Sequence, residues 1–240
     1  GVGKTTIARI LAKAINCAQA PTAEPCNECA NCRQITQSSG VDVIEIDGAS
    51  NRGIDDARRL REDIGFAPME FRYKVFIIDE AHMLTREAFN ALLKTLEEPP
   101  GHVTFILATT EPHKFPATII SRCQHYIFQR LTEPELTEHL KKVLGRENAE
   151  FEESAVNLIA KRAAGSVRDS MSLLGQVMAL GQGSVREADV RSILGLAGRE
   201  VYEELFAAIA VHDVVALSGL LHKILDQGLD LGVFLRELNQ

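Results

Sequence analysis

Tryptophan is absent from this 240-residue chain, and aromatic residues make up only 5% of it. No apolar run approaches the length of about 18 to 20 residues that a membrane-spanning helix requires, and we expect no secretion signal. A net charge of −7 argues against a protein whose whole surface coats DNA nonspecifically, so any DNA contact should be local. With 45% apolar and 25% charged residues, the composition is that of a globular protein of two or three domains. We expect a cytoplasmic protein without a membrane partner.

The chain opens on half of a phosphate-binding loop, Gly1-Val2-Gly3-Lys4-Thr5-Thr6, which matches the end of the pattern G-x-x-x-x-G-K-[ST]. Glycines let successive N–H groups point at phosphate oxygens, and the helix that follows presents its positive dipole end. Lys4 would contact the β- and γ-phosphates, and the Thr5 hydroxyl would complete the coordination of Mg²⁺. Taken alone, the match also fits a simple glycine turn before a helix. We expect that helix to pack through an apolar face made of Ile7, Ile10, Leu11, Ala14 and Ile15.

Two acids at the end of an apolar run support the phosphate-binding interpretation. Residues 74–78 read Lys-Val-Phe-Ile-Ile, which is typical of a parallel strand covered on both faces, and Asp79 and Glu80 follow. Ligands of such sheets bind at the carboxyl ends of the strands. Asp79 would hold Mg²⁺ and Glu80 would orient the attacking water. The alternative is that the acids merely begin the next loop.

Four of the five cysteines fall within sixteen residues and predict a metal site: Cys17, Cys26, Cys29 and Cys32. Two C-x-x-C steps fold readily around one ion, and Cys17 supplies the fourth thiolate of a tetrahedral zinc site. An iron–sulfur cluster is the less favoured alternative, because its fourth cysteine usually follows the run. With no open position, the zinc would be structural. Cys123 stands apart, and we expect it to be a small buried residue.

Strand and helix patterns alternate through the first half of the chain. Strands are expected at 41–46, 74–79 and 103–108, with helices at 54–64 and 89–96 between them. This order predicts an α/β fold, a parallel sheet with helices on both faces, as far as about Gln129. Beyond Thr132 only helical spacing remains, with breaks at 181–184 and 195–198.

Several polar residues occupy positions where they could contact a triphosphate. Arg168 lies in the first turn of a helix capped by Ser166, an unfavourable place for a cation unless an anion compensates. Arg122 precedes a strand-like segment, 124–128, from whose edge it could complete a neighbouring subunit's site. Solvated surface arginines are the alternative for both.

Two further polar pairs could either contact a ligand or have a purely structural role. Thr109 and Thr110 end a strand beside the acids, where a hydroxyl could sense the γ-phosphate or simply begin a turn. Asn51 and Arg52 precede a helix and would either contact a phosphate or cap that helix.

Together these motifs resemble the gamma/tau subunits of the bacterial DNA polymerase III clamp loader. The resemblance rests on GVGKTT, the cysteine insertion after its helix, VFIIDEAHML, FNALLKTLEEPP, LATTEPHKFPATIISRC and GSVRDSMSLL. It implies an AAA+ P-loop ATPase fold with a zinc module insertion, followed by an α-helical lid and the start of an α-helical collar. The implied domains are 1–131, with the zinc module at about 17–39, then 132–195 and 196–240.

The resemblance also implies a function. ATP binding and hydrolysis with Mg²⁺ would load the sliding clamp, beta, onto primer–template DNA within a ring that includes delta, delta-prime and further gamma/tau copies. A tau-type extension would add the polymerase core and the helicase as partners, within the DNA polymerase III holoenzyme. Polymerisation by this chain itself is not expected, since no second cluster of metal-binding acids is present.

Residue roles follow by matching positions. The loop residues and Asp79 hold ATP and Mg²⁺, and Glu80 is the catalytic acid. Thr110 matches the first sensor, Arg168 the second sensor, and Arg122 the arginine supplied in trans. Asn51 and Arg52 match positions that touch the DNA backbone.

The resemblance further implies that the strand before the loop, its first glycine and a segment that closes over adenine lie outside this sequence. We therefore expect the chain as given to bind nucleotide weakly and to lack most ring contacts. A ring subunit that does not hydrolyse ATP, a helicase loader and a branch-migration motor are the alternatives. Intact Lys4, Thr5, Asp79 and Glu80 argue against the first. The cysteine insertion and Ser121-Arg122-Cys123 argue against the others.

Overall fold

The computed structural model describes the chain except for residues 1, 51–52, 227–231, 233 and 235–240. Gly1, Asn51 and Arg52, all predicted to contact ligands, therefore lie outside the described residues. Gly3–Phe128 form one compact unit, and the residues from Gln129 onward belong to a second. The two units are described separately.

The first unit is built on a three-stranded parallel sheet. Its strands are β1 (Val43–Asp47), β2 (Lys74–Asp79) and β3 (Val103–Leu107), in the order β1-β2-β3. Asp47 pairs in register with Asp79, and Ile78 with Leu107. The central strand is buried from Lys74 to Ile78, as the uninterrupted apolar run predicted, and Asp79 at its end is partly exposed. The parallel sheet is confirmed.

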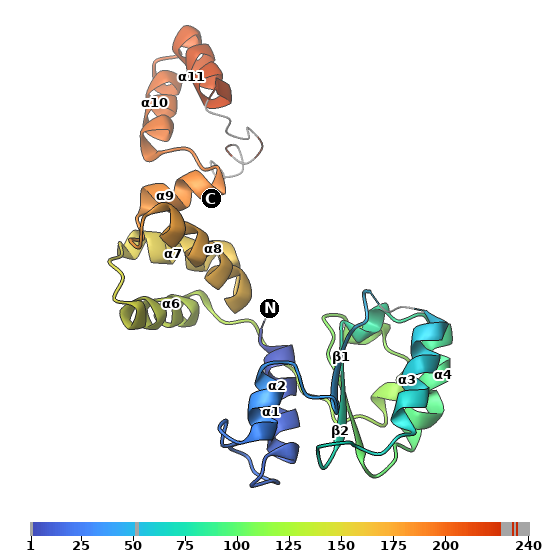
Figure 1. Ribbon diagram of the computed structural model, residues 1–240. Coiled ribbons are helices and arrows are strands. Elements are labelled where there is room, and N and C mark those ends of the chain that lie inside the picture. Colours follow the sequence, from blue (N-terminus) through green and yellow to red (C-terminus); the bar gives the residue numbers. More distant parts are fainter. Residues whose placement is uncertain (1, 51–52, 227–231, 233, 235–240) are drawn as a thin grey trace. The chain divides into compact units, whose positions relative to one another are not determined.

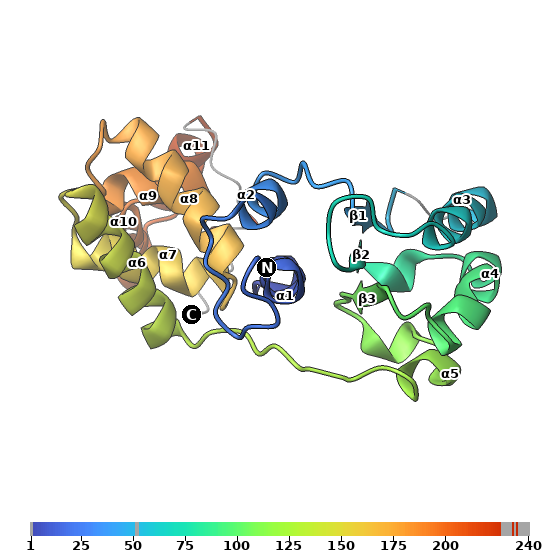
Figure 2. The same ribbon diagram turned by 60° about the horizontal axis from the view of Figure 1, so that its bottom comes forward.

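Helices cover both faces of this sheet (Figure 1). One face carries α1 (Lys4–Asn16) and α2 (Ala30–Thr36), and the other carries α3 (Ile54–Ile64) and α4 (Arg86–Glu97). Short elements follow the strands: the 3-10 turns η1 (Ala81–Met83) and η2 (Pro112–Lys114), and the one-turn helix α5 (Ala117–Ile120) beside α4 (Figure 2). The predicted two-sided arrangement is confirmed.

The face of α1 that packs on the sheet differs from the predicted one. Ala8 and Ala12 are buried with Val75 and Ile77 of β2, whereas the larger residues Ile7, Ile10 and Leu11 are 46%, 39% and 45% exposed. Alanine side chains allow close approach of a helix to a sheet, which a prediction based on hydrophobic size overlooks. Only Ile15 of the larger side chains in the predicted face packs partly against this core.

The strand expected at 124–128 and the burial of Cys123 are both wrong. The backbone from Gln124 to Phe128 is irregular, and Tyr126 and Ile127 are 72% and 79% exposed. Within the described residues, the segment has no neighbouring strand to satisfy its backbone groups. Cys123, which follows α5 at the start of this segment, is exposed as well.

The second unit is helical, as predicted. It contains α6 (Glu133–Glu147), α7 (Glu153–Ala163), α8 (Val167–Leu180) and α9 (Glu187–Leu194) around a shared apolar core. Thr132 and Glu135 form a capping box at the start of α6. The breaks expected at 181–184 and 195–198 separate α8 from α9 and α9 from the next helix.

A further pair of helices, α10 (Arg199–Ala210) and α11 (Val214–Asp226), packs around its own small core. Val201, Leu205, Leu220 and Ile224 belong to it. No helix in the described part of the chain has the length and apolar character needed to cross a bilayer.

Candidate nucleotide-binding site

The buried Asn16 fixes the direction of α1 against the sheet. Its side chain donates to the carbonyl of Tyr73 at 3.0 Å and accepts from the N–H of Tyr73 at 2.8 Å, just before β2 begins. The end of α1 is thereby tied to the start of β2, so the two elements run in opposite directions. The start of α1 consequently lies at the carboxyl end of β2, where Asp79 is the last residue of the strand and Glu80 follows.

The first turn of α1 has the geometry of an anion site. Gly3 precedes it with φ 87° and ψ 16°, a left-handed conformation that glycine adopts without a steric penalty. The first N–H groups of a helix have no partner within the helix, and this turn contains no acidic residue to complement its dipole. Lys4 adds a positive charge there. A phosphate group would satisfy both the N–H donors and the cation.

Thr5 and Asp79 bring two hard oxygen ligands together. The Thr5 hydroxyl donates to Oδ2 of Asp79 at 2.7 Å, across 74 residues of sequence. The other carboxylate oxygen, Oδ1, accepts from the N–H of Glu80 at 2.9 Å. A hydroxyl and a carboxylate beside a phosphate cradle are ligands that suit Mg²⁺, which takes few protein ligands and relies on phosphate and water for the rest.

Glu80 stands at the turn after β2 in an unusual backbone conformation. Its φ and ψ are both 43°, in the left-handed region that non-glycine residues seldom occupy and that clusters at functional sites. Its Oε2 accepts from the hydroxyl and the N–H of Thr110 at 2.9 and 3.2 Å, and its Oε1 lies 3.9 Å from Nζ of Lys4. The structure thus brings together Lys4, Thr5, Asp79, Glu80 and Thr110, as the sequence predicted.

Backbone hydrogen bonds between β2 and β3 hold Thr110 in place. Ala108 donates to the carbonyl of Ile78, and Ala81 donates to the carbonyl of Ala108, both at 2.9 Å. These bonds continue the sheet beyond its last paired residues and set Thr109 and Thr110 beside the acids. Thr6 follows in the first turn of α1 and is exposed.

Gly48, which the sequence did not mark, packs against the same turn. A Cβ atom there would lie 2.8 Å from the carbonyl oxygen of Glu80 and 3.0 Å from that of Asp79. We expect Gly48→Ala to displace this backbone, to lower the unfolding free energy by about 1–3 kcal/mol and to weaken the site. Chemical denaturation checks this. Gly101→Ala is the control, because nothing lies within 4 Å of its Cβ position; equal losses in both variants would contradict the explanation.

Arg122 and Arg168 belong to different units, and each is described within its own unit. Arg122 follows α5 in the first unit, where its guanidinium donates to the carbonyl of Thr118 at 2.8 Å and lies 3.3 Å from Oε1 of Glu97. It is a surface residue at a helix end rather than at a strand edge. Arg168 belongs to the second unit, in the first turn of α8, where Ser166 caps the helix by accepting from the N–H of Asp169 at 3.3 Å. Its side chain has no hydrogen-bond or ion-pair partner among the described residues.

The four clustered cysteines converge as predicted. All four sulfur atoms lie within 4.8 Å of one another, and those of Cys17 and Cys26 are 3.5 Å apart. Tetrahedral zinc with Zn–S bonds of about 2.3 Å spaces its sulfurs by about 3.8 Å, so the cluster fits this ion. The N–H groups of Cys29 and Cys32 donate to the sulfurs of Cys26 and Cys29, both at 3.4 Å.

Local environment acts differently on the individual thiols. The backbone N–H of Ala18 and then that of Cys32 lower the pKa of Cys29 to about 6, which favours the thiolate that binds metal. The backbone N–H of Cys26 lowers the pKa of Cys17 in the same way. Burial raises the pKa of Cys32 to about 12, so only a bound cation would keep this sulfur ionised at neutral pH.

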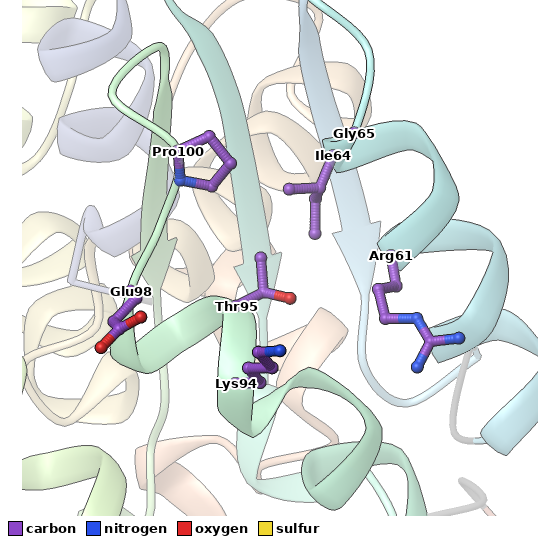
Figure 3. Close-up of a pocket in the computed structure, with 7 residues that line it drawn as sticks. All are labelled: Arg61, Ile64, Gly65, Lys94, Thr95, Glu98 and Pro100. Atoms are coloured by element: carbon purple, nitrogen blue, oxygen red, sulfur yellow. The ribbon is translucent and has the colours of Figure 1, made fainter.

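A shallow hollow elsewhere in the first unit is not part of this site. It measures about 250 Å³ and lies between the ends of α3 and α4, lined by Arg61, Ile64, Lys94, Thr95 and Pro100 among others (Figure 3). Pro100 accepts from the N–H of Val103 at the start of β3, so the hollow lies at the edge of the sheet opposite Asp79. None of the predicted nucleotide contacts lines it.

Comparison with known families decides the affiliation of the chain. A family model for the DNA polymerase III delta subunit matches residues 1–132, and one for the ATPase lid domain of the DNA polymerase III clamp loader subunit matches 135–183. A third, for domain III of DNA polymerase III subunits gamma and tau, matches 185–240. The chain belongs to the gamma/tau family of DNA polymerase III clamp-loader subunits.

Individual members of the gamma/tau family agree along nearly the whole sequence. DNA polymerase III subunit tau of Bacillus subtilis is 47% identical over 230 residues, which are 96% of this chain and 41% of that protein. Subunit tau of Escherichia coli is 43% identical over 238 residues, which are 99% of this chain and 37% of that protein. The chain thus spans about two fifths of the length of these relatives.

Solved structures show the same fold in a more distant protein. The RuvB Holliday junction branch migration motor of Thermotoga maritima matches with a TM-score of 0.55 at 19% identity, over 88% of this chain and 66% of that one. At this identity the likeness concerns the AAA+ fold alone. The branch-migration alternative therefore gives way to the gamma/tau family.

Proposed function

We propose that this chain is the ATP-hydrolysing part of a clamp-loader subunit, which uses ATP to load the sliding clamp onto primed DNA. One observation carries the proposal: the contact set in which Thr5 binds Asp79 and Lys4 faces Glu80, at the start of α1 and the end of β2. In a P-loop ATPase, phosphate, Mg²⁺ and the attacking water meet at this point.

Each residue of the set has a distinct task in this proposal. Gly3, Lys4 and the first N–H groups of α1, with Val2 and Thr6 flanking, bind the β- and γ-phosphates. Thr5 and Asp79 would hold Mg²⁺, which would neutralise charge at the phosphates. Glu80 accepts a proton from the attacking water, and Thr110 orients the Glu80 carboxylate through the hydrogen bond at 2.9 Å.

Arg122 and Arg168 complete the proposed site from outside this set. The side chain of Arg122 is 43% exposed and lies on the surface of its unit, so an adjacent subunit could receive it in trans as a cation for the transferred phosphoryl group. Arg168, exposed in the first turn of α8, would contact the triphosphate from the lid. A phosphate would compensate the unfavourable position of this cation at a helix start.

The wider assembly is proposed from the family. The partners are delta, delta-prime and further gamma/tau subunits, the beta clamp and primer–template DNA, with the polymerase core and helicase where a tau-type extension exists. The proposed domains are 1–131, 132–195 and 196–240, acting in the bacterial cytoplasm. Asn51 and Arg52 remain the proposed contacts to the DNA backbone.

We also propose a structural zinc ion in the module at about 17–39. The four thiols would hold it without an open position for a reacting ligand, so its task is to stabilise a segment that otherwise has few apolar contacts. In that segment, only Cys17, Cys32 and Ile35 are buried.

Loss of the Lys4 ammonium tests the proposed nucleotide site directly. In the full-length chain, we expect Lys4→Ala to weaken ATP binding at least about tenfold, because a point charge on the phosphates disappears. Titration calorimetry or fluorescence with an ATP analogue measures this. Lys13→Ala in the same helix is the matched control, since Nζ of Lys13 donates to Oδ1 of Asn27 in the cysteine module at 2.9 Å, near the other end of α1. Unchanged ATP affinity in Lys4→Ala would overturn the proposed function.

A further inference from the structure

His82 is a buried histidine that joins two acids beside the proposed site. It lies in η1, and its side chain is only 5% exposed. Its Nδ1 is 2.9 Å from Oγ1 of Thr109 and 3.3 Å from Oε2 of Glu80, while its Nε2 is 3.3 Å from Oε1 of Glu111. Both ring nitrogens are therefore engaged with polar groups on either side.

The segment after β3 is held to this ring by further contacts. The hydroxyl of Thr109 accepts from the N–H of Glu111 at 2.9 Å, and Lys114 donates to Glu111, which lowers the pKa of that carboxyl below its ordinary value. Glu111 is thus a fixed anion for Nε2. Oε2 of Glu80 contacts both Nδ1 of His82 and the hydroxyl of Thr110.

We propose that His82 is a positioning residue for ATP hydrolysis, which fixes the carboxylate of Glu80 by linking it to Thr109 and Glu111 after β3. This inference rests on the proposed function, because it assigns His82 a task only where Glu80 acts on water. His82 touches neither phosphate nor Mg²⁺ in this scheme. It acts through Glu80.

The physical reason lies in the freedom of a glutamate side chain at a turn. Glu80 occupies a left-handed backbone position after the last residue of β2, so its own strand no longer determines where the carboxylate points. Thr110 and His82 both contact the same oxygen of Glu80, Oε2, while the other oxygen, Oε1, faces Lys4. A general base must lie within hydrogen-bond reach of its water. A freely rotating Glu80 carboxylate would therefore lower the rate of ATP hydrolysis without weakening ATP binding.

Amide substitutions at His82 distinguish the contributions of its two ring nitrogens to the rate of ATP hydrolysis. In the full-length chain assembled with its clamp-loader partners, we expect His82→Ala to lower kcat for ATP hydrolysis about tenfold with little change in KM or ATP affinity. His82→Asn places an amide near the Nδ1 position, beside Thr109 and Glu80, whereas His82→Gln reaches the Nε2 position beside Glu111. The proposal predicts that Asn restores more activity than Gln.

Two further variants complete the design. Thr109→Val should lower kcat as well, and its effect should be less than multiplicative with His82→Ala, because both remove the same link. His113→Ala is the matched control: this 74% exposed histidine lies 3.6 Å from the other oxygen of Glu111 and should leave kcat unchanged.

The outcomes distinguish this inference from the proposed function. If Glu80→Gln abolishes hydrolysis but His82→Ala keeps the wild-type kcat, the positioning role is wrong and the ATPase assignment stands. If His82→Ala reduces kcat only in proportion to folded protein, measured by thermal unfolding and ATP binding, the role is structural and the inference fails. If Glu80→Gln hydrolyses ATP normally, the proposed function itself is wrong.

Discussion

Glu80→Gln is expected to abolish most ATP hydrolysis while preserving ATP binding. The substitution keeps the size of the side chain and an oxygen that can accept from Thr110, which Glu80 contacts at 2.9 and 3.2 Å. It removes the carboxylate that takes the proton from water, an effect worth about 10²–10⁴-fold in kcat. Steady-state hydrolysis by the reconstituted clamp loader, with clamp and primed DNA, measures the loss, and an ATP titration shows the retained affinity.

Glu62→Gln provides the matched control for this charge change. Glu62 is exposed near the end of α3 and is not a member of the contact set. Its replacement by glutamine removes one negative charge, as Glu80→Gln does. A normal rate in Glu80→Gln would favour a ring subunit that binds partners without hydrolysing ATP. Equal losses in both variants would show that net charge, rather than the position of Glu80, determines the rate.

The sheet and the contact set could be predicted because their signals are local in sequence. Val75 to Ile78 form an uninterrupted apolar run, and a strand of this kind must be covered on both faces. Its end then places Asp79 and Glu80 at the edge where ligands of parallel sheets bind. The loop at Gly3 and Lys4 also has a local signal, because glycine adopts the left-handed backbone found at Gly3 without a steric penalty. These constraints converge on one edge without knowledge of any long-range contact.

The errors arise where contacts between residues distant in sequence determine which side chains are buried. Ile7, Ile10 and Leu11 have the spacing of a buried face, but Ala8 and Ala12 contact the sheet because they permit closer approach. The importance of Gly48 depends on the backbone of another strand, which no local pattern reports.

Other errors and omissions come from partners distant in the chain. The segment from Gln124 to Phe128 has the residues of a strand, yet a strand also needs a neighbour, which local composition does not supply. His82 was missed for a related reason. Its nearness to the acids in sequence was a usable signal, but its contacts to Thr109 and Glu111 appear only when β3 lies beside β2.

Loss of one of the four proposed zinc ligands is expected to unfold the cysteine module. Cys32 is fully buried, and its sulfur lies within 4.8 Å of the other three. We expect Cys32→Ser to lower the zinc content from one ion per chain to a small fraction. Structural zinc contributes about 10–16 kcal/mol in zinc-finger peptides, so residues 17–39 should become sensitive to proteolysis and the thermal midpoint should fall. Metal analysis by mass spectrometry, limited proteolysis and calorimetry measure the three effects.

Cys123→Ser separates this effect from general cysteine chemistry. Cys123 is the exposed fifth cysteine and lies outside the cluster, so its variant should retain both zinc and the thermal midpoint.

The pH dependence of zinc content is a further test of the proposed site. Because protons compete with metal for thiolates, the wild-type chain should lose zinc as the pH falls. Burial raises the pKa of the Cys32 thiol, so this sulfur in particular ionises less readily without the ion. Iron and a visible absorption band in the purified chain would instead favour the iron–sulfur alternative. A wild-type chain that binds neither metal, with unchanged stability in Cys32→Ser, would show that the four thiols converge for packing alone.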